Sequence, residues 1–320
     1  MTSRPITLAI LAVIALVPIW LGDRYFAHIA VMVCLTGVLA LSLNLMLKVG
    51  QLSLAQVVFM STGAYGSALM SMGWGLSPAM AIPLAGIASG LLALLLGPLL
   101  LRITGVYFVL LTFSLGQIVN LVLQDMTGIT GGNSGLFGIP RLELFGMRLA
   151  RPESFYPFAL ALLVLAYLVT VLLYRSRIGA VMQSIEQNEA LSRSLGVNVL
   201  AWRVAVFGLS GLLAGVSGAA YAHFIGFISP AAFTFSVSVN ILVVNVIGGI
   251  ASPIGPLVGA VLLVPLPELL REVQEYQLLA YGLLLIGFLA FFPNGITGFL
   301  FRKSRTSSPL RRMVKRLRQR

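Results

Sequence analysis

Charge is scarce in this chain of 320 residues. Only 9% of the residues are charged, whereas 58% are hydrophobic, and residues 49–101 and 204–267 contain no Asp, Glu, Lys or Arg. A soluble domain usually has about 25% charged and about 45–50% apolar residues. A soluble fold of this composition would expose more apolar surface than it could cover. The composition therefore excludes a soluble domain and predicts a chain whose main solvent is lipid.

The motifs that would indicate catalysis are also missing. Cys34 is the only cysteine, so the sequence predicts neither an intramolecular disulfide nor a cysteine metal site. No Gly-x-x-x-x-Gly-Lys-Ser/Thr loop for ATP phosphates and no His-Glu-x-x-His zinc motif occurs. We therefore expect no catalytic residue, no metal and no cofactor, which disfavours an intramembrane enzyme.

A proton-coupled secondary carrier is disfavoured as well. Such a carrier normally holds ionisable groups inside its spans, because a group there must change its charge. The apolar runs of this chain have almost none, and only His28 and His223 titrate near neutral pH. Both histidines lie close to the expected ends of spans, where a structural role is more common than a proton relay.

The apolar runs predict an all-α, polytopic transmembrane bundle. A spanning helix needs about 20 mostly apolar residues, and Gly and Pro are tolerated inside packed membrane helices. The runs divide at glycine and proline clusters into ten expected spans: 6–22, 25–47, 50–72, 79–101, 103–124, 154–174, 204–224, 232–250, 254–270 and 276–301. Residues 1–301 are expected to form one transmembrane domain, and residues 302–320 a basic cytoplasmic tail.

The charges outside the spans predict the orientation. With the N-terminus inside, the inner segments carry sixteen basic residues and the outer segments carry five. Basic residues favour the cytoplasmic side, so we expect both termini in the cytoplasm of a bacterial cell, with the chain in the inner membrane. The pI near 10.6 then reflects membrane topology, and no nucleic-acid partner is predicted.

Two loops are long enough to bind other molecules. In the inner loop, 175–203, an apolar stripe of helical period precedes a polar cluster, and Gly196 suits a C-terminal cap. This pattern predicts a compact helical surface for a protein partner, although a helix lying on lipid remains an alternative. The outer loop, 125–153, is rich in glycine and offers many backbone donors. It is expected to meet a periplasmic protein or to act only as a lid, and its candidate contact residues are Thr130, Gly131, Gly132 and Asn133.

Uncharged polar side chains occur inside the expected spans. They could line a path that a zwitterion crosses without meeting a fixed charge, or they could simply hydrogen-bond between helices, which contributes about 0.6 kcal/mol each. The candidates for the translocation path are Asn44, Gln51, Ser53, Gln56, Tyr65, Gln117, Asn240 and Asn245.

Several segments resemble one known family. The inner loop looks like the coupling loop of bacterial ABC-importer permeases, with Glu189-Ala190-Leu191…Gly196 approximating the usual Glu-Ala-Ala…Gly pattern. GQLSLAQVVFMSTGAYGSAL (50–69), GVYFVLLTFSLGQIV (105–119), TGGNSGLFGIP (130–140) and VIGGIASPIGPLVGAVLLVPLPELL (246–270) are similar to branched-chain amino-acid permeases, the longer of the two paired kinds. The resemblance covers most of residues 40–295.

The resemblance implies one part of a five-part importer. Its partners would be a second homologous permease, two ATP-binding subunits and a periplasmic substrate-binding protein, besides membrane lipid. ATP hydrolysis would belong to the separate subunits, and the implied substrates are branched-chain or other hydrophobic amino acids. Urea, short amides and other amino acids are alternatives within the family. The residues expected to couple to the ATPase are Glu186, Asn188, Glu189, Arg193 and Gly196.

Overall fold

The structure is a computed structural model, and it describes residues 23–144, 146–269, 282–283, 285–288 and 295–298. The first expected span, 6–22, the basic tail, 302–320, and most of the last expected span, 276–301, lie outside the described residues.

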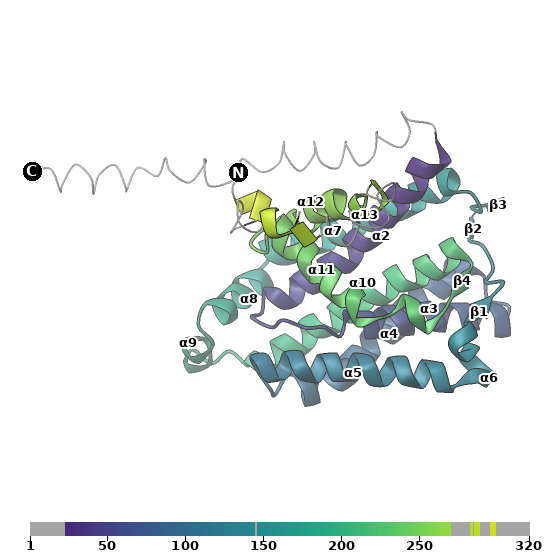
Figure 1. The fold of residues 1–320 in the computed structure, drawn as a ribbon. Helices are drawn as coiled ribbons and strands as arrows, with labels where there is room; N and C mark the ends of the chain where they lie inside the picture. Colours follow the sequence, from purple (N-terminus) through teal and green to yellow (C-terminus); the bar gives the residue numbers. More distant parts are fainter. Residues whose placement is uncertain (1–22, 145, 270–281, 284, 289–294, 299–320) are drawn as a thin grey trace, which may run out of the picture.

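The described chain is almost wholly helical (Figure 1). Its helices are α2 (Arg24–Leu47), α3 (Gln56–Gly73), α4 (Pro78–Leu100), α5 (Val106–Asp125), α6 (Thr127–Thr130), α7 (Pro152–Arg175), α8 (Arg177–Gln187), α9 (Glu189–Ser194), α10 (Val199–Ile225), α11 (Phe235–Gly248), α12 (Gly255–Leu263) and α13 (Leu266–Leu269). Two short 3-10 helices, η1 and η2, cover Gly132–Ser134 and Pro230–Ala232. Two antiparallel pairs join β1 (Leu136–Phe137) to β4 (Phe227–Ile228) and β2 (Glu143–Leu144) to β3 (Met147–Arg148).

The expected all-α membrane bundle is confirmed. Six helical segments among the described residues are long and apolar enough to span a membrane, namely α2, α4, α5, α7, α10 and the segment 230–248 that contains α11. These match six of the ten expected spans to within about five residues. The total of ten spans remains a prediction.

Two expected spans differ from the helices observed. The span expected at 50–72 begins late, because Gly50 has a φ of +71° and residues 51–54 are not helical, so that α3 starts only at Gln56. The span expected at 254–270 holds only α12, nine residues long, and the short α13. Hydropathy marks both segments as membrane-compatible, but it carries no information about where backbone hydrogen bonding stops.

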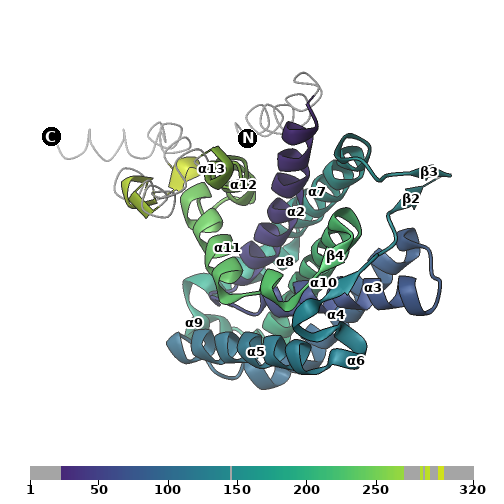
Figure 2. The same ribbon diagram turned by 45° about the vertical axis from the view of Figure 1, so that its right-hand side comes forward.

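Helix α10 is the centre of the bundle. It packs against α4, α3 and α2, and α7 lies on the far side of α2 (Figures 1 and 2). Glycines permit this close packing, because a Cβ on Gly63 of α3 would overlap the Gly215 carbonyl, and one on Gly218 would overlap the Met60 carbonyl. Such close approach of backbones is what small residues permit in membrane helices.

The two long loops lie at opposite ends of the bundle. In Figure 1 the helices α8 and α9 project from one end, whereas α6 and the four short strands gather at the other. The helices between them connect the two sites described next.

Candidate functional site

The inner loop folds into two short helices, α8 and α9, which together form a knob over residues 177–196 (Figure 1). The predicted apolar stripe is confirmed: Met182 and Ile185 of α8 are buried against the bundle. Asn188 separates the helices and caps the second, since its Oδ1 accepts a hydrogen bond from the Leu191 N–H at 3.0 Å. Gly196 follows α9 with a φ of +84°, as a C-terminal cap requires.

The tip of the knob is apolar and exposed. Leu191 is 57% exposed and Leu195 is 75% exposed. Because each lies on a short helix that projects from the bundle, they are available to a protein surface. Clustered exposed leucines beside charged groups are typical of a binding patch.

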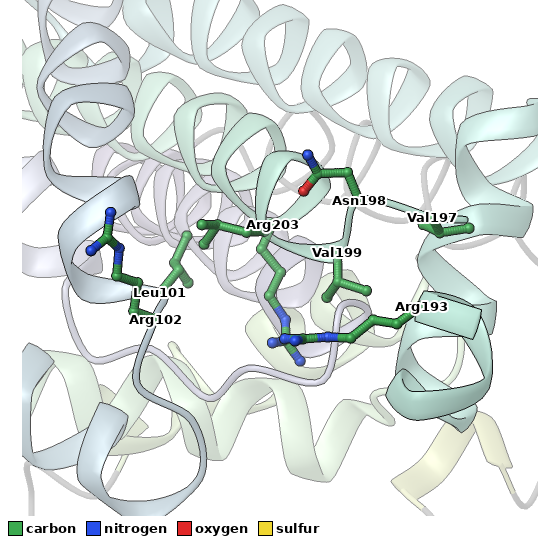
Figure 3. Close-up of a pocket in the computed structure, with 8 residues that line it drawn as sticks. Leu101, Arg102, Arg193, Val197, Asn198, Val199 and Arg203 are labelled. Atoms are coloured by element: carbon green, nitrogen blue, oxygen red, sulfur yellow. The ribbon is translucent and has the colours of Figure 1, made fainter. Parts of the chain in front are cut away.

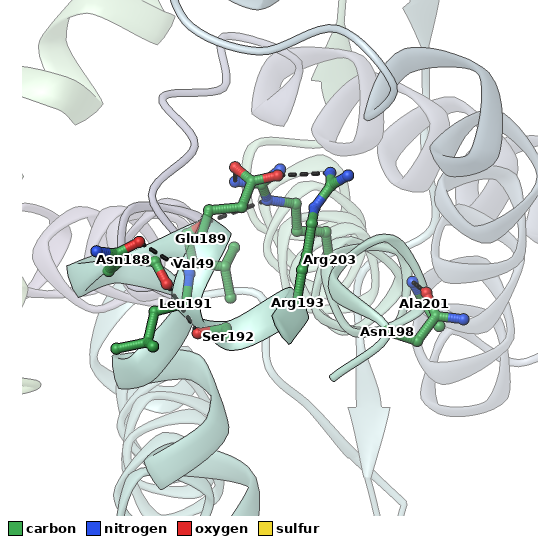
Figure 4. A network of polar contacts seen from close by, with 9 residues as sticks. All are labelled: Val49, Asn188, Glu189, Leu191, Ser192, Arg193, Asn198, Ala201 and Arg203. Carbon is green, nitrogen blue, oxygen red and sulfur yellow. Dashed lines mark hydrogen bonds and ion pairs between the residues drawn. The ribbon is translucent and has the colours of Figure 1, made fainter. Parts of the chain in front are cut away.

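One buried arginine holds α9 against the bundle (Figure 4). Arg203, on the second turn of α10, is only 4% exposed, and its guanidinium lies 2.7 Å from one carboxylate oxygen of Glu189. The other oxygen of Glu189 lies 2.6 Å from the guanidinium of Arg193. Arg203 also donates to the Val49 carbonyl at 3.4 Å. We call Glu189, Arg193 and Arg203 the strap.

Glu189 stays ionised at physiological pH. Burial disfavours the charged form of Glu189, but the hydrogen bond and charge of Arg203, followed by those of Arg193, outweigh that effect and lower the pKa of the Glu189 carboxyl below its ordinary value. A second tie joins Glu186 to Lys48 at 3.4 Å. Both acids expected to face an ATPase therefore have partners within this chain.

The remaining predicted coupling residues lie on the surface of the knob. Glu186, Asn188, Arg193 and Gly196 are exposed, and a side chain on Gly196 would meet no atom within 4 Å. The structure thus brings all five predicted residues together on one projection. Their contact with an ATP-binding subunit stays a prediction.

Most of the predicted path residues lie inside the bundle. Asn44, Gln51, Ser53, Gln56, Tyr65 and Asn245 are each at most 4% exposed. Asn44 of α2 donates to Asn245 of α11 at 3.2 Å and accepts from Tyr174 of α7 at 2.8 Å. These contacts tie α2, α7 and α11 together.

A second polar connection crosses the centre of the bundle. The Gln56 amide of α3 donates to Ser210 Oγ at 2.9 Å, and Ser210 Oγ donates to the Ser42 carbonyl at 2.8 Å. Sequence reasoning missed Ser210, because a serine in an apolar run gives no sign of which neighbour it bonds. Asn44, Gln56 and Asn245 thus hydrogen-bond between helices, whereas the Tyr65 hydroxyl is buried without a hydrogen-bond partner among the described residues. The place of these residues on a translocation path stays a prediction.

Gln117 and Asn240 differ from this group because both are exposed. Gln117 lies on α5, which is mostly exposed in this chain. Only 11% of the most apolar 18-residue stretch of α5 is buried, whereas 78% of the corresponding stretch of α2 is buried. Asn240 lies on α11 and lines a cavity of about 290 Å³ whose lining is mostly apolar, with Thr36, Ser217 and Tyr221 as its other residues that carry a polar side-chain group. Gln117 is therefore a polar side chain on an exposed surface of α5 that is otherwise mostly apolar, with Leu110, Ile118 and Leu121 among its exposed residues.

The glycine-rich outer loop is fixed to the end of α10. β1 pairs with β4, the rings of Phe137 and Phe227 stack at 4.4 Å, and His223 contacts the Pro140 carbonyl at 2.7 Å. Arg141 donates to the Phe224 carbonyl. The four predicted contact residues are not equally accessible, since Thr130 and Gly132 are buried, Gly131 is half-buried and Asn133 is exposed.

Sequence reasoning also missed Arg203. Its partner Glu189 lies fourteen residues earlier, on a different helix, so the two are not the i, i+3 or i, i+4 neighbours that a helical pattern would pair. A lone arginine at the start of an apolar span was the only available signal. In the described part of the chain, no group of three or more His, Cys, Asp or Glu side chains could hold a metal ion.

Comparison with known proteins identifies the family of this chain. The family model described as branched-chain amino acid transport system, permease component, matches residues 25–291. The high-affinity branched-chain amino acid transport system permease protein LivM of Salmonella typhimurium is 33% identical over 92% of this chain and 75% of its own length. LivM of Escherichia coli is 31% identical over the same shares. No solved structure matches the chain significantly.

A more distant relative is the probable branched-chain amino acid transport permease protein LivH of Methanocaldococcus jannaschii, which is 26% identical over 78% of this chain and 84% of its own length. The family match covers almost all of the described helical bundle. This polytopic membrane protein is a transporter subunit rather than an enzyme, and it belongs to the family of branched-chain amino acid ABC-transport permeases.

Proposed function

We propose that this chain carries branched-chain amino acids into the cell as one of two permeases in an ATP-driven importer. A permease of this class works with ATP-binding and substrate-binding proteins. The complete assembly would add a second homologous permease, two ATP-binding subunits and a periplasmic binding protein. The single observation that carries the proposal is the family match across residues 25–291, supported by two relatives named for these substrates.

The knob is the proposed contact with an ATP-binding subunit. Leu191 and Leu195 would supply apolar contacts, and Glu186 and Arg193 would surround them with charge. A buried apolar centre with a polar rim is the usual composition of a protein interface. The strap supports this proposal, because it fixes the direction in which α9 projects.

The proposed orientation places the knob in the cytoplasm and the outer loop in the periplasm. Ser134 and Ser194 are both exposed. Ser134 ends the 3-10 helix η1, next to α6, and Ser194 ends α9, so they lie at opposite ends of the bundle (Figure 1). In a Cys34→Ala background, Ser134→Cys is expected to react with an impermeant maleimide in intact cells, whereas Ser194→Cys reacts only after lysis. Labelling of Ser194→Cys from outside would contradict the orientation.

The proposed path runs along α5 at the contact with the second permease. Ser114 and Gln117 of α5 are exposed, and a side-chain amide facing hydrocarbon without a partner is costly. A second permease packed against α5 would remove that cost by enclosing Ser114 and Gln117 in an aqueous path between the two subunits. Asn240 is the other candidate on an open face, whereas the buried path candidates fit a structural role better.

The outer loop is the proposed contact for the binding protein. Asn133 is the exposed member of the predicted set. The loop is bonded to the end of α10, so a protein seated on it would press on the helix that leads to the strap at the other end. This continuity supports a path for the signal between substrate delivery and ATP hydrolysis.

Uptake into proteoliposomes tests the function. With both permeases, the ATP-binding subunits and the binding protein present, we expect ATP-dependent accumulation of radiolabelled leucine. Omission of the ATP-binding subunits should abolish it, and uptake that persists without them would indicate a secondary carrier. ATP-dependent uptake of urea or a short amide in place of leucine would support an ATP-driven importer but contradict the proposed substrate.

A pair of variants in the same assay locates the path. Gln117→Trp is expected to remove most of the uptake, because it would fill a narrow polar passage. Leu95→Trp is the matched control, since Leu95 is 75% exposed on the apolar face of α4 and would face lipid. Equal uptake by the two variants would show that the path does not run along α5.

A further inference from the structure

A pocket lined by arginines opens at the knob end of the bundle (Figure 3). It has a volume of about 380 Å³ and lies between the end of α4, the knob and the first turns of α10. Arg102 lies on the opposite side of the pocket from Arg193 (Figure 3). The lining residues are Leu101, Arg102, Arg193, Val197, Asn198, Val199, Leu200 and Arg203.

The charges of the pocket are not balanced within the described chain. Three arginines line it and no acidic residue does. Glu189 bridges Arg193 and Arg203 with its single negative charge, and Arg102 forms no ion pair with any described residue. Two positive charges are therefore left over in a concave site.

The backbone adds to this positive field. Val199 and Leu200 are the first two residues of α10, and both line the pocket. The first N–H groups of a helix have no partner within it, and the helix dipole makes this end partly positive. α10 has 27 residues, and the buried Arg203 fixes one wall of the site. Arginine and helix N–H donors together suit the oxygens of a phosphate group.

An apolar surface begins at the mouth of the pocket. Arg102 follows the last two turns of α4, where Leu95 is 75% exposed and Leu99 is 69% exposed. Val106, which begins α5 on the other side of Arg102, is 72% exposed. A phosphate bound beside Arg102 would thus have acyl-compatible surface directly next to it.

We propose that this pocket binds the phosphate of an anionic phospholipid from the leaflet at the knob end, with the acyl chains lying along the last turns of α4. The inference rests on the proposed orientation, in which that leaflet is the cytoplasmic one and is rich in anionic lipid. A basic pocket between membrane helices on this side is suited to anionic headgroups. Leu95 and Leu99 lie on a spanning helix and face the bilayer in this orientation, so a lipid headgroup can reach Arg102 without leaving the membrane.

The site also has a consequence for the knob. The lipid phosphate would compete with Glu189 for Arg193 and Arg203, or bridge them to Arg102. Either contact links the membrane surface to the direction of α9. The composition of the inner leaflet would then influence how the knob presents Leu191 and Leu195.

Native mass spectrometry of the purified permease tests the proposal. Phosphatidylglycerol and phosphatidylcholine are titrated separately against the wild type, Arg102→Gln and Arg177→Gln. Arg177 is the matched control, because it is an exposed arginine at the same end but outside the pocket. Arg102→Gln is expected to weaken phosphatidylglycerol binding about fivefold, which corresponds to the about 1 kcal/mol typical of one basic residue near an anionic surface. Arg177→Gln and Arg102→Lys should bind like the wild type.

Other outcomes would overturn the proposal. An equal loss in Arg102→Gln and Arg177→Gln would mean a diffuse surface charge, and equal binding of phosphatidylcholine would mean an apolar site. Complete competition by glycerol 3-phosphate would identify a soluble anion as the ligand. Displacement of the lipid by the ATP-binding subunits would mean that an acidic side chain of that partner, and not a lipid phosphate, occupies the pocket. The assay uses neither ATP nor substrate, so its failure leaves the uptake test of the proposed function unaffected.

Discussion

Gly218→Ala is expected to destabilise the bundle by at least about 3 kcal/mol, at the upper end of what overpacking usually costs. A Cβ at this position would overlap the Met60 carbonyl of α3, which is backbone and cannot rotate away. The two helices would have to separate, and α10 is the element against which α2, α3 and α4 pack. The expected observation is a clear fall in the midpoint of thermal unfolding of the purified permease, with a lower yield of folded protein from the membrane.

Gly116→Ala is the matched control, and the expected sign is opposite. Gly116 is also inside a spanning helix, α5, but a Cβ there would meet no atom within 4 Å. Alanine is better than glycine inside a helix by about 1 kcal/mol, so this variant should be as stable as the wild type or more so. If the two variants unfold at the same temperature, the contact between α3 and α10 is not as close as the structure has it.

The positions of the spanning helices could be predicted from the sequence because hydropathy is a property of the whole segment. Six expected spans coincide with apolar helices of the structure. The shape of the knob was also predictable, since the stripe that includes Met182 and Ile185, the capping Asn188 and the C-terminal Gly196 are all local features. Each of these depends on residues at most a few turns apart.

The partners of polar residues could not be predicted in the same way. Asn44 and Gln117 both stand in apolar helices, yet one bonds to Asn245 inside the bundle and the other is exposed on α5. The difference depends on helix rotation and on neighbours about 200 residues away in the sequence. The pairing of Arg203 with Glu189 and the arginine pocket depend on the same long-range packing.

Arg203→Gln is expected to reduce coupled transport strongly while the permease still reaches the membrane. α9 has six residues, too few to be stable as an isolated helix, so its position depends on contacts with the rest of the chain. Loss of Arg203 removes the buried ion pair of the strap, and we expect this to lower the stability of the α9 contact by about 1–3 kcal/mol. This is less than the cost of breaking a fully buried pair, because the Glu189 side chain is 31% exposed. The measurement is substrate-stimulated ATP hydrolysis and leucine uptake per folded permease.

Arg193→Gln is the comparison that separates the two halves of the strap. Arg193 is 62% exposed and pairs with Glu189 four residues earlier on the same helix, a contact worth about 0.3–0.5 kcal/mol. Its removal should change coupling only slightly. A loss as large as that in Arg203→Gln would mean that Arg193 is a central contact with the ATP-binding subunit rather than a charge at its rim, and that the buried pair is not what holds α9.

A double-mutant cycle between Glu189 and Arg203 then decides how Glu189 acts. If Glu189 serves mainly to bond Arg203, then Glu189→Gln, Arg203→Gln and the double variant should lose similar amounts of coupling, because the second change removes nothing further. If Glu189 also contacts the ATPase, Glu189→Gln should lose more coupling than Arg203→Gln, and the double variant should resemble Glu189→Gln. The pair should not create a pH dependence between about pH 6 and 8. The pKa of Glu189 is lowered in the folded state, so its stabilising effect is complete above the ordinary glutamate pKa of about 4.3 and is lost only as the pH falls below that value. A change in coupling within the neutral range would therefore point to a titrating group other than the strap.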